Sequence, residues 1–518
     1  MTTPHMTPDD FRRVGREMVE FIARYWETVD RLPVNPSATG AISPGDVARQ
    51  FPTHGPESPG SPGEWDRILA DVQDNVMPGL THWQSPQFYG YFPCNVSAPA
   101  VLGELLSAGL GQQGMLWSTS PACTEVETVI VGWMARLLAL PAPMSPGGAG
   151  GGVILGTASE ATLTAMVAAR DRARRSLRTA GDPRAANPHF TLYTSTQAHS
   201  SVIKAAMVAG LADGPDDRTH LRLIDVDDRQ RMRADLLAAA IRDDTAAGRV
   251  PFFVSATMGT TGTTACDPLQ EVAQACSGVA QACSLSSPRS GERSTGDPHL
   301  RPWLHCDAAH SGACLICPEL RWMSVGLDRF DSFCFNPHKW LLTNFDCDLF
   351  YVADRRWLTD ALSITPEYLR NPASDAGAVI DYRDWQVPLG RRFRALKLWF
   401  VLRQYGADGL RAHVREHVRL AALLEGWVRQ DSRFELMAER TCNLLCFRLR
   451  GDDALSRRLM DRLNASGRMF LSHTVIESTG QKRLVLRMAI GATTTREEHV
   501  RAAWGWIVEE AQRLVPSR

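Results

Sequence analysis

The sequence Asn336-Pro337-His338-Lys339-Trp340 directly follows an apolar run, residues 332–335. It places Lys339 at the carboxyl end of a predicted buried strand. A buried ammonium group is costly, so such a lysine must be neutralised, paired or used in chemistry. Desolvation lowers the pKa of an amine and makes it nucleophilic, which suits a Schiff base with an aldehyde. Most lysines near strand ends are solvated, so this interpretation depends on what the neighbouring strand ends carry.

Four other short apolar runs also end in polar residues. They are 152–156 before Thr157-Ala158-Ser159, 190–193 before His199, 250–256 before Thr260-Thr261, and 303–306 before Asp307-Ala308-Ala309-His310. Helix-length segments separate these runs, which predicts an α/β fold with a buried, mostly parallel sheet. Open α/β sheets bind ligands at the carboxyl ends of their strands. We therefore expect these polar residues to meet Lys339 in one site.

These residue types fit one ligand, pyridoxal phosphate. The Thr157-Ala158-Ser159 turn opens a helix whose free N–H groups suit a phosphate, and Asn336 with Thr260-Thr261 is expected to complete that cradle. Asp307 is expected to pair with the pyridine nitrogen, which makes the ring an electron sink. His199 is expected to lie against the ring face, and Lys339 to hold the aldehyde as a Schiff base.

Each of these residues alone has a simpler explanation. Ser159 is then a helix cap, Asp307 a strand-end cap and His199 a surface histidine. Their order along one sheet favours the cofactor over those separate explanations.

Longer stretches of the sequence carry a resemblance to a known family. They include His82-Trp-Gln-Ser-Pro86, Phe88-Tyr-Gly-Tyr-Phe-Pro93, Ser120-Pro-Ala-Cys-Thr-Glu-Val-Glu127, Gly151–Thr162, Gln197–Ser201, Ile316–Glu319, Phe335–Leu342, Asn344–Cys347 and Asp381–Arg394. In these runs the chain resembles the pyridoxal-phosphate-dependent group II decarboxylases, and most closely the aromatic-L-amino-acid decarboxylases. The resemblance implies fold type I of the pyridoxal-phosphate-dependent transferases, which is the aspartate aminotransferase-like α/β fold.

The resemblance also implies a domain organisation and a homodimer. An N-terminal helical arm (residues 1–95) is expected to pack on a second subunit, followed by a large cofactor-binding domain (96–395) with a mostly parallel sheet and a smaller C-terminal α+β domain (396–518). Two segments of the large domain are expected to be mobile, an insertion at about 278–301 and a catalytic lid at about 363–377. By resemblance, Ala309 and His338 join the cofactor-binding residues.

The start of the chain carries a helix signal of its own. Thr7-Pro8-Asp9-Asp10 combines a capping hydroxyl, a proline in the first turn and acidic residues, and apolar residues then recur at helical spacing as far as Tyr25. Spacing alone leaves open whether this helix packs within its own domain or on a partner.

Composition is that of an ordinary soluble enzyme. A chain of 518 residues is too long for a single hydrophobic core, so two or three domains are expected. Of these residues 44% are hydrophobic and 22% are charged, and the net charge is −1. We expect no nucleic-acid or membrane partner, and a cytoplasmic location, because basic blocks, a leader-like start and long apolar runs are missing from the sequence. Cys314-Leu-Ile-Cys317 has no second ligand pair at zinc-site spacing, so no metal is expected.

The implied activity is decarboxylation of an aromatic L-amino acid to an arylalkylamine and CO₂. The resemblance assigns catalysis to Lys339, Asp307, His199 and Tyr368, with Tyr368 returning the proton to the α-carbon. The alternative is an aromatic acetaldehyde synthase, which often has phenylalanine at the matching position and releases aldehyde, ammonia and peroxide. Two further alternatives are an acidic-substrate decarboxylase and a catalytically silent scaffold.

Substrate preference is expected to depend on an apolar wall. Trp83, Tyr91, Phe92 and Pro93 suit an aromatic side chain, and Gly390 leaves room for a large one. Four residues depart from the animal aromatic-decarboxylase pattern. They are Cys94, Gln113, Met115 and His310. The choice among tryptophan, 5-hydroxytryptophan, phenylalanine, tyrosine and DOPA therefore stays open.

Overall fold

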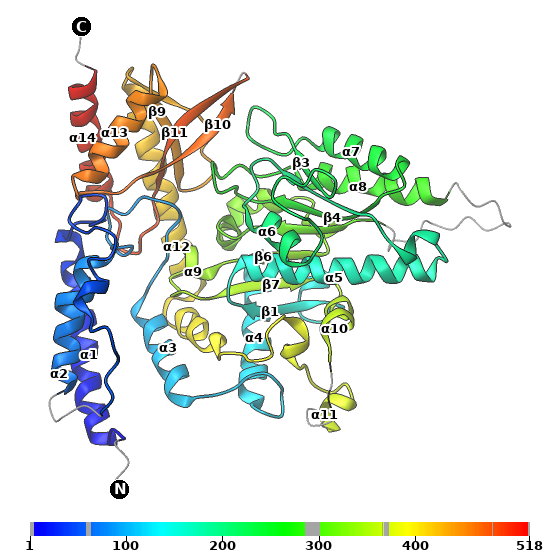
Figure 1. Ribbon diagram of the computed structural model, residues 1–518, viewed down its shortest axis with the longest axis horizontal. Helices are drawn as coiled ribbons and strands as arrows, with labels where there is room; N and C mark the ends of the chain where they lie inside the picture. Colours follow the sequence, from blue (N-terminus) through cyan, green and yellow to red (C-terminus); the bar gives the residue numbers. More distant parts are fainter. Residues whose placement is uncertain are drawn as a thin grey trace.

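The computed structural model describes residues 5–58, 64–284, 301–364, 366, 372–478 and 480–515. Within these ranges the chain builds two β-sheets, each covered by helices and joined by one long helix (Figure 1). The N-terminal helices lie to one side of this body, next to the C-terminal helix.

A seven-stranded sheet forms the centre of the larger part. Its strands are β1 (Gly151–Leu155), β2 (Phe190–Ser195), β3 (Leu221–Ile224), β4 (Val250–Thr257), β5 (Trp303–Asp307), β6 (Ser332–Phe335) and β7 (Asp348–Val352). Their order is β1-β7-β6-β5-β4-β2-β3, and β7 runs antiparallel to both of its neighbours while β6, β5, β4, β2 and β3 are mutually parallel. The five strands predicted from apolar runs are confirmed; β3 and β7 were not predicted.

Helices cover both faces of this sheet, which explains why its strands are apolar on both sides. One face packs against α4 (Pro121–Leu137), α7 (Ala234–Ala246) and α8 (Leu269–Ser284). The other packs against α5 (Ala158–Thr179), α6 (Ser201–Val208) and α10 (Arg356–Leu362). All eight residues of β4 are buried, as this arrangement requires. The mostly parallel α/β fold predicted from the sequence is confirmed.

A four-stranded antiparallel sheet forms the smaller part. Its strands are β8 (Phe434–Leu436), β9 (Leu444–Leu449), β10 (Ser472–Ser478) and β11 (Gln481–Ala489), in the order β10-β11-β9-β8. Its apolar core includes residues of α13 (Asp453–Ala465) and α14 (Glu497–Leu514). The 37-residue α12 (Arg394–Gln430) contributes to the cores of both parts, and its helical path is interrupted at Gly406, where φ is 60°.

The N-terminal segment begins with the predicted helix. In α1 (Pro8–Thr28) the Thr7 hydroxyl accepts the Asp10 N–H at 3.1 Å and the Asp10 carboxylate returns to Thr7, which is a capping box. Only Val14 of α1 is buried, and α2 (Glu64–Asp71) has no buried residue. Further along, α3 (Ala98–Leu110) packs on α12 yet leaves several leucines exposed. These helices therefore present apolar side chains that their own chain does not cover.

Two helices of the large part are only four residues long. The helix α9 (Pro337–Trp340) follows β6, and α11 (Pro372–Asp375) lies in the predicted lid. Residues 285–300 of the predicted insertion, and 365 and 367–371 of the lid, are outside the described residues. No helix in the described ranges is both long and apolar enough to cross a membrane.

Candidate active site

A cavity of about 230 Å³ opens at the carboxyl ends of the parallel strands. Its lining comes from six separate stretches of chain. The lining residues are Phe92, Thr157, Ala158, Ser159, His199, Ser201, Thr257, Gly259, Thr261, Asp307, Ala309, His310, Asn336, His338, Lys339 and Phe345. The structure thus brings together the residues predicted to bind the cofactor, with the exception of Thr260.

Lys339 projects from α9, one turn after β6 ends. Its backbone N–H donates to the Asn336 carbonyl at 3.0 Å, which fixes the tight turn between β6 and α9. The Nζ lies 5.7 Å from the centroid of the Phe92 ring. Burial lowers the pKa of Lys339, and the nearby charge of Asp307 partly opposes this. The site therefore favours the uncharged, nucleophilic amine more than water does.

The amino-terminal end of α5 forms one wall of the cavity. Thr157 caps the helix by accepting the Glu160 N–H, and Asn336 Oδ1 accepts the Ala158 N–H at 3.1 Å. Ala158 and Ser159 line the cavity within the first turn, where helix N–H groups and the helix dipole favour an anion. This end of the cavity therefore suits a phosphate group.

Asp307 and His199 also line the cavity. Asp307 is 4% exposed and accepts the Ala309 N–H at 3.0 Å, which orients its carboxylate. The Ser201 N–H donates to His199 Nδ1 at 3.1 Å and so fixes the imidazole ring. Burial, with a smaller contribution from Lys339, lowers the pKa of His199, while Asp307 opposes the shift. His199 is therefore neutral at neutral pH.

His338 lies next to Lys339 and is held by Cys347, the residue before β7. The Cys347 N–H donates to His338 Nδ1 at 3.0 Å, and burial with the adjacent Lys339 lowers the pKa of His338 to about 3. This imidazole is consequently an uncharged wall of the site rather than a titrating group at neutral pH.

The predicted threonine pair divides between the cavity and the core. Thr261 lines the cavity, and its carbonyl accepts a hydrogen bond from Arg487 Nη2 of β11 at 2.7 Å. The Thr260 hydroxyl instead lies 3.0 Å from the Thr263 hydroxyl and is fully buried. Only Thr261 is therefore placed to contact a ligand.

Gly259, which also lines the cavity, cannot be replaced by a larger residue without strain. Its φ of +90° and the contact that a Cβ would make with Ser311 both require glycine.

These residues fit pyridoxal phosphate as a group. The cavity combines a helix amino-terminus for a phosphate, a buried carboxylate for a ring nitrogen and a desolvated lysine for an aldehyde. Residues of cavity lining that sequence reasoning had not singled out are Ser201, Thr257, Gly259 and Phe345. Ser201 and Phe345 lie in stretches that carry the family resemblance, so the resemblance could have been used to predict them as site residues.

The predicted substrate wall is only partly at this cavity. Phe92 lines it, with its ring stacked on His310 at a centroid distance of 3.9 Å. Trp83 and Tyr91 stack on one another at 5.6 Å and are 36% and 54% exposed, beyond the lining. Pro93 packs against Gly491 instead. Of the three aromatic residues of the predicted wall, Phe92 therefore lines the cavity, whereas Trp83 and Tyr91 form a more exposed pair outside its lining.

The remaining predicted substrate residues lie outside the lining of this chain's cavity. Cys94 is half-buried, and its carbonyl accepts a hydrogen bond from Gln84 at 2.7 Å. Gln113 Oε1 accepts the Arg391 N–H at 2.6 Å, and Gln113 also faces Gly390. The Met115 carbonyl accepts the Arg383 N–H. Gln113, Met115 and Gly390 therefore gather at a separate place, and Tyr368 lies outside the described residues.

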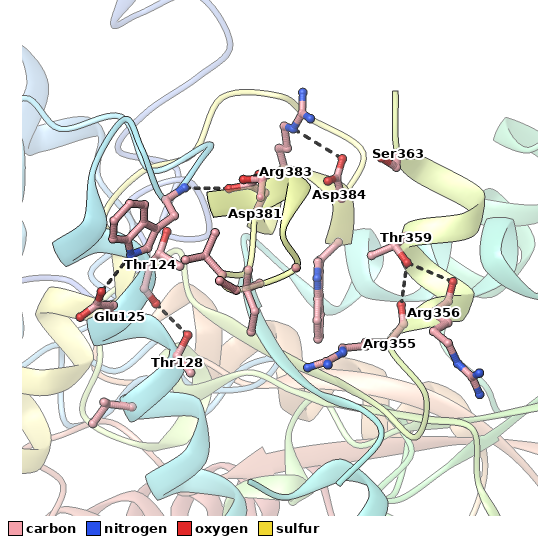
Figure 2. A pocket seen from close by; sticks show the side chains of 18 residues that line it. Thr124, Glu125, Thr128, Arg355, Arg356, Thr359, Ser363, Asp381, Arg383 and Asp384 are labelled. Atoms are coloured by element: carbon pink, nitrogen blue, oxygen red, sulfur yellow. Dashed lines mark hydrogen bonds and ion pairs between the residues drawn. The ribbon is translucent and has the colours of Figure 1, made fainter. Parts of the chain in front are cut away.

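A second, more open cavity of about 910 Å³ lies between α4, α10 and residues 374–385 (Figure 2). Asp381 accepts the Trp117 backbone N–H at 2.8 Å, and Glu125 accepts the Trp117 indole N–H at 2.8 Å. Figure 2 shows Arg383 and Asp384 together at its upper edge, where their side chains form an ion pair. It contains neither Lys339 nor any other residue predicted to bind the cofactor.

Comparisons with known proteins agree with this geometry. Residues 44–450 match the pyridoxal-dependent decarboxylase conserved domain. The chain is 41% identical to phenylacetaldehyde synthase of Arabidopsis thaliana over 98% of this chain and 97% of that one, and 42% identical to aromatic-L-amino-acid decarboxylase of Bos taurus over 98% of each. It superposes on the crystal structure of Oryza sativa TDC with PLP and tryptamine with a TM-score of 0.88 at 38% identity, covering 98% of this chain and 99% of that one. The chain therefore belongs to the pyridoxal-dependent decarboxylase family, and its cofactor is pyridoxal phosphate.

Proposed function

We propose that the protein decarboxylates aromatic L-amino acids to arylalkylamines and CO₂, as an aromatic-L-amino-acid decarboxylase. The observation that carries this proposal is the desolvated Lys339 amine beneath the Phe92 ring, in a cavity that also contains Asp307 and the start of α5. The relatives named for aromatic amino acids support the substrate class.

The residues of the cavity have separate tasks in this proposal. The N–H groups at the start of α5, with Thr157, Ser159 and Thr261, bind the phosphate, and Lys339 binds the aldehyde carbon. Asp307 keeps the ring nitrogen protonated, and His199 lies against the ring. When bound, the cofactor supplies an electron sink for the electron pair left when the carboxylate departs.

An aromatic substrate fits the charge of the cavity better than an acidic one. Among the residues of its lining, Lys339 is the one amine or guanidinium. The nearby Arg487 lies 5.2 Å over Phe92, but it already donates four hydrogen bonds, to the carbonyls of Tyr91, Thr261 and Gly262 and to the Ser472 hydroxyl. A second substrate carboxylate would therefore lack a free cation here. The Phe92 ring offers an aromatic contact instead.

A homodimer is part of the proposal. On α3, Leu102, Leu105, Leu106 and Leu110 are each more than 40% exposed, and such a stripe is expected to be covered by a second copy. Gln113 and Met115 follow this stripe directly. Their distance from the cavity of their own chain is consistent with contact across the dimer, where they would help select the substrate.

The proton that replaces CO₂ comes from Tyr368 in this proposal, by resemblance to the decarboxylases. The alternative product is an aromatic acetaldehyde, because a phenylacetaldehyde synthase is also similar to this chain at 41% identity. Tyr368 and His199 together favour the amine. Measurement of ammonia and peroxide beside the amine separates these two activities.

The test is to incubate the purified protein with pyridoxal phosphate and each aromatic L-amino acid, and to identify the products. Borohydride reduction followed by peptide mapping should then find a pyridoxyl group on Lys339. Lys339→Ala should abolish both results, whereas Lys204→Ala, an exposed lysine of α6, should leave them unchanged. Amine formation without modification of Lys339 would contradict the proposal.

A further inference from the structure

Two buried cysteines, one from each part of the chain, have their sulfur atoms in contact. Cys314 Sγ and Cys442 Sγ are 3.3 Å apart, and both side chains are 0% exposed. Cys314 belongs to the 3-10 helix η8 (Ser311–Ile316), which follows β5 of the large sheet. Cys442 lies two residues before β9 of the smaller sheet. The contact therefore joins two residues that are 128 positions apart in the chain.

Neighbouring cysteines on the same two stretches bind other groups. Cys317, the second cysteine of the Cys314-Leu-Ile-Cys317 motif, has its Sγ 3.8 Å from the Arg411 carbonyl. Cys446 of β9 has its Sγ 3.4 Å from the Gly262 carbonyl. A buried cysteine of this kind behaves as a small hydrophobic residue with a weak donor. Cys314 and Cys442 differ because each has a second thiol as its neighbour.

The distance between the two sulfurs suits a covalent bond between them. A disulfide has an S–S length of about 2.05 Å, so the sulfurs need to approach by about 1.3 Å from their present separation. Divided between the two side chains, this is less than about 1 Å for each sulfur. Both side chains belong to one hydrophobic core, so they already share the same dry surroundings.

The hydrogen bonds of the pair make Cys442 the more reactive thiol. With Cys314 as the donor of the sulfur–sulfur hydrogen bond, the Cys442 S–H donates to Ser311 Oγ at 3.8 Å. The hydrogen bond from Cys314 lowers the pKa of Cys442, the Ser311 contact and the Arg440 charge add to this, and burial opposes it. Burial raises the pKa of Cys314 well above its usual value. Because the thiolate is the nucleophile, Cys442 is expected to react first.

We propose that Cys314 and Cys442 form a reversible disulfide when the protein meets hydrogen peroxide. The Cys442 thiolate attacks one peroxide oxygen and the O–O bond breaks, which gives a sulfenic acid and hydroxide. The Cys314 sulfur then attacks the Cys442 sulfur, so that the S–S bond forms and the S–O bond breaks. The departing oxygens leave as water with the two thiol protons and the two protons of the peroxide. Two thiols are thus oxidised by two electrons while one peroxide is reduced to two water molecules.

This disulfide would connect the two parts of the protein independently of the helix that joins them. Residues 314 and 442 enclose the whole of α12, which contributes to the cores of both parts and is interrupted at Gly406. The new bond therefore closes a large loop that contains this interruption. A cross-link across a long loop restricts the unfolded chain and stabilises the folded one.

The test exposes the protein, loaded with pyridoxal phosphate, to hydrogen peroxide under native conditions. The remaining thiols are then alkylated and the peptides are mapped by mass spectrometry. Wild type should give two joined peptides, with a mass two hydrogens below the sum of the reduced peptides and the link at residues 314 and 442. Oxidation should raise the midpoint of thermal unfolding by several degrees, and dithiothreitol should reverse both changes.

Variants of four cysteines separate this pair from its neighbours. Cys314→Ala and Cys442→Ala each remove one of the two sulfurs and should abolish both the link and the rise in the midpoint. Cys442→Ser should do the same and guards against a packing defect of the smaller alanine. Cys317→Ala and Cys446→Ala change a thiol on the same two stretches of chain and should keep the wild-type response.

The wild-type protein alone is sufficient to overturn the proposal. The half-buried Cys94 and Cys266 report whether the peroxide has acted. Their oxidation without a link between Cys314 and Cys442 would contradict it, as would a link from Cys314 to Cys317 instead. A rise in the midpoint that persists in both alanine variants of the pair would also contradict it. No substrate enters these measurements, so their failure is distinct from a failure of the proposed decarboxylation.

Discussion

Arg391 Nη2 lies 2.6 Å from Glu127 Oε1, and both side chains are buried. This ion pair joins α4 to the stretch before α12, two parts of the chain that are 264 residues apart. Glu127 also accepts the Ile154 N–H of β1 at 2.8 Å, and Arg391 donates to the Ile154 carbonyl at 3.1 Å. The pair therefore fixes the edge strand of the large sheet to two further elements.

Removing one member of this pair should be strongly destabilising. Glu127→Ala leaves the Arg391 guanidinium buried without its counter-ion, and we expect a loss of about 3–5 kcal/mol in the free energy of unfolding. Urea denaturation followed by circular dichroism measures it. Glu319→Ala breaks the Arg415 pair, whose side chains are 51% and 50% exposed, and should leave the midpoint within error. Equal effects of the two variants would contradict this account.

Two helical glycines should respond in opposite ways to replacement by alanine. A Cβ at Gly103 would lie 2.7 Å from the Lys397 Cα of α12, so Gly103→Ala must separate α3 from α12 and should cost about 1–3 kcal/mol. Gly505 of α14 has nothing within 4 Å of its Cβ position, so Gly505→Ala should stabilise by about 0.5–1 kcal/mol through helix propensity. Thermal unfolding of both variants checks the sign of each change.

Asp331 should make stability depend on pH in the acid range. The nearby Arg172 and Arg301 hold the pKa of Asp331 below its usual 3.8 despite burial. A depressed pKa in the folded state gives stability that is fully present above the unfolded value, and that is lost as pH falls from about 4 through the folded value. Unfolding free energies measured from pH 6 to pH 2 should fall less steeply in Asp331→Asn. The exposed Asp216→Asn should reproduce the wild-type slope.

Tyr368→Phe tests the proton donor of the proposed reaction. If Tyr368 returns the proton to the α-carbon, amine formation should slow by roughly 10²–10⁴-fold. Aldehyde and ammonia are the side products to quantify in the same assay. Tyr405→Phe, on α12, serves as the matched control. An amine yield equal to wild type would remove Tyr368 from the mechanism.

Local sequence was sufficient to predict that several of the candidate site residues meet in one cavity. Lys339, Asp307, His199 and Asn336 each follow an apolar run, and parallel strands bring such strand ends to one edge. The helix start at Thr157 was recognisable for the same reason, because capping is a property of a few consecutive residues.

Other features depend on contacts that no local pattern carries. β7 enters the sheet between β1 and β6 in the antiparallel direction, after a short connection whose only helix is the four-residue α9, so the alternation of strands and long helices did not reveal it. The positions of Gln113 and Gly390 next to each other, away from Lys339, result from long-range packing. The Arg391–Glu127 ion pair likewise could not be predicted, because neither local sequence indicates which distant residue it contacts.

Arg487 connects the C-terminal part of the chain to the lining of the cavity that contains Lys339. From β11 it donates to the carbonyls of Tyr91 and Thr261, so one guanidinium joins the smaller sheet to Tyr91 and to Thr261 of the cavity lining. If the C-terminal segment is exchanged between two enzymes of this family, Arg487 is exchanged with it. The chimaera then receives a residue that supports the cavity lining as well as the four-stranded sheet. Chimaeras built at the α12 boundary should be designed with residue 487 and the two carbonyls it holds treated as a single unit.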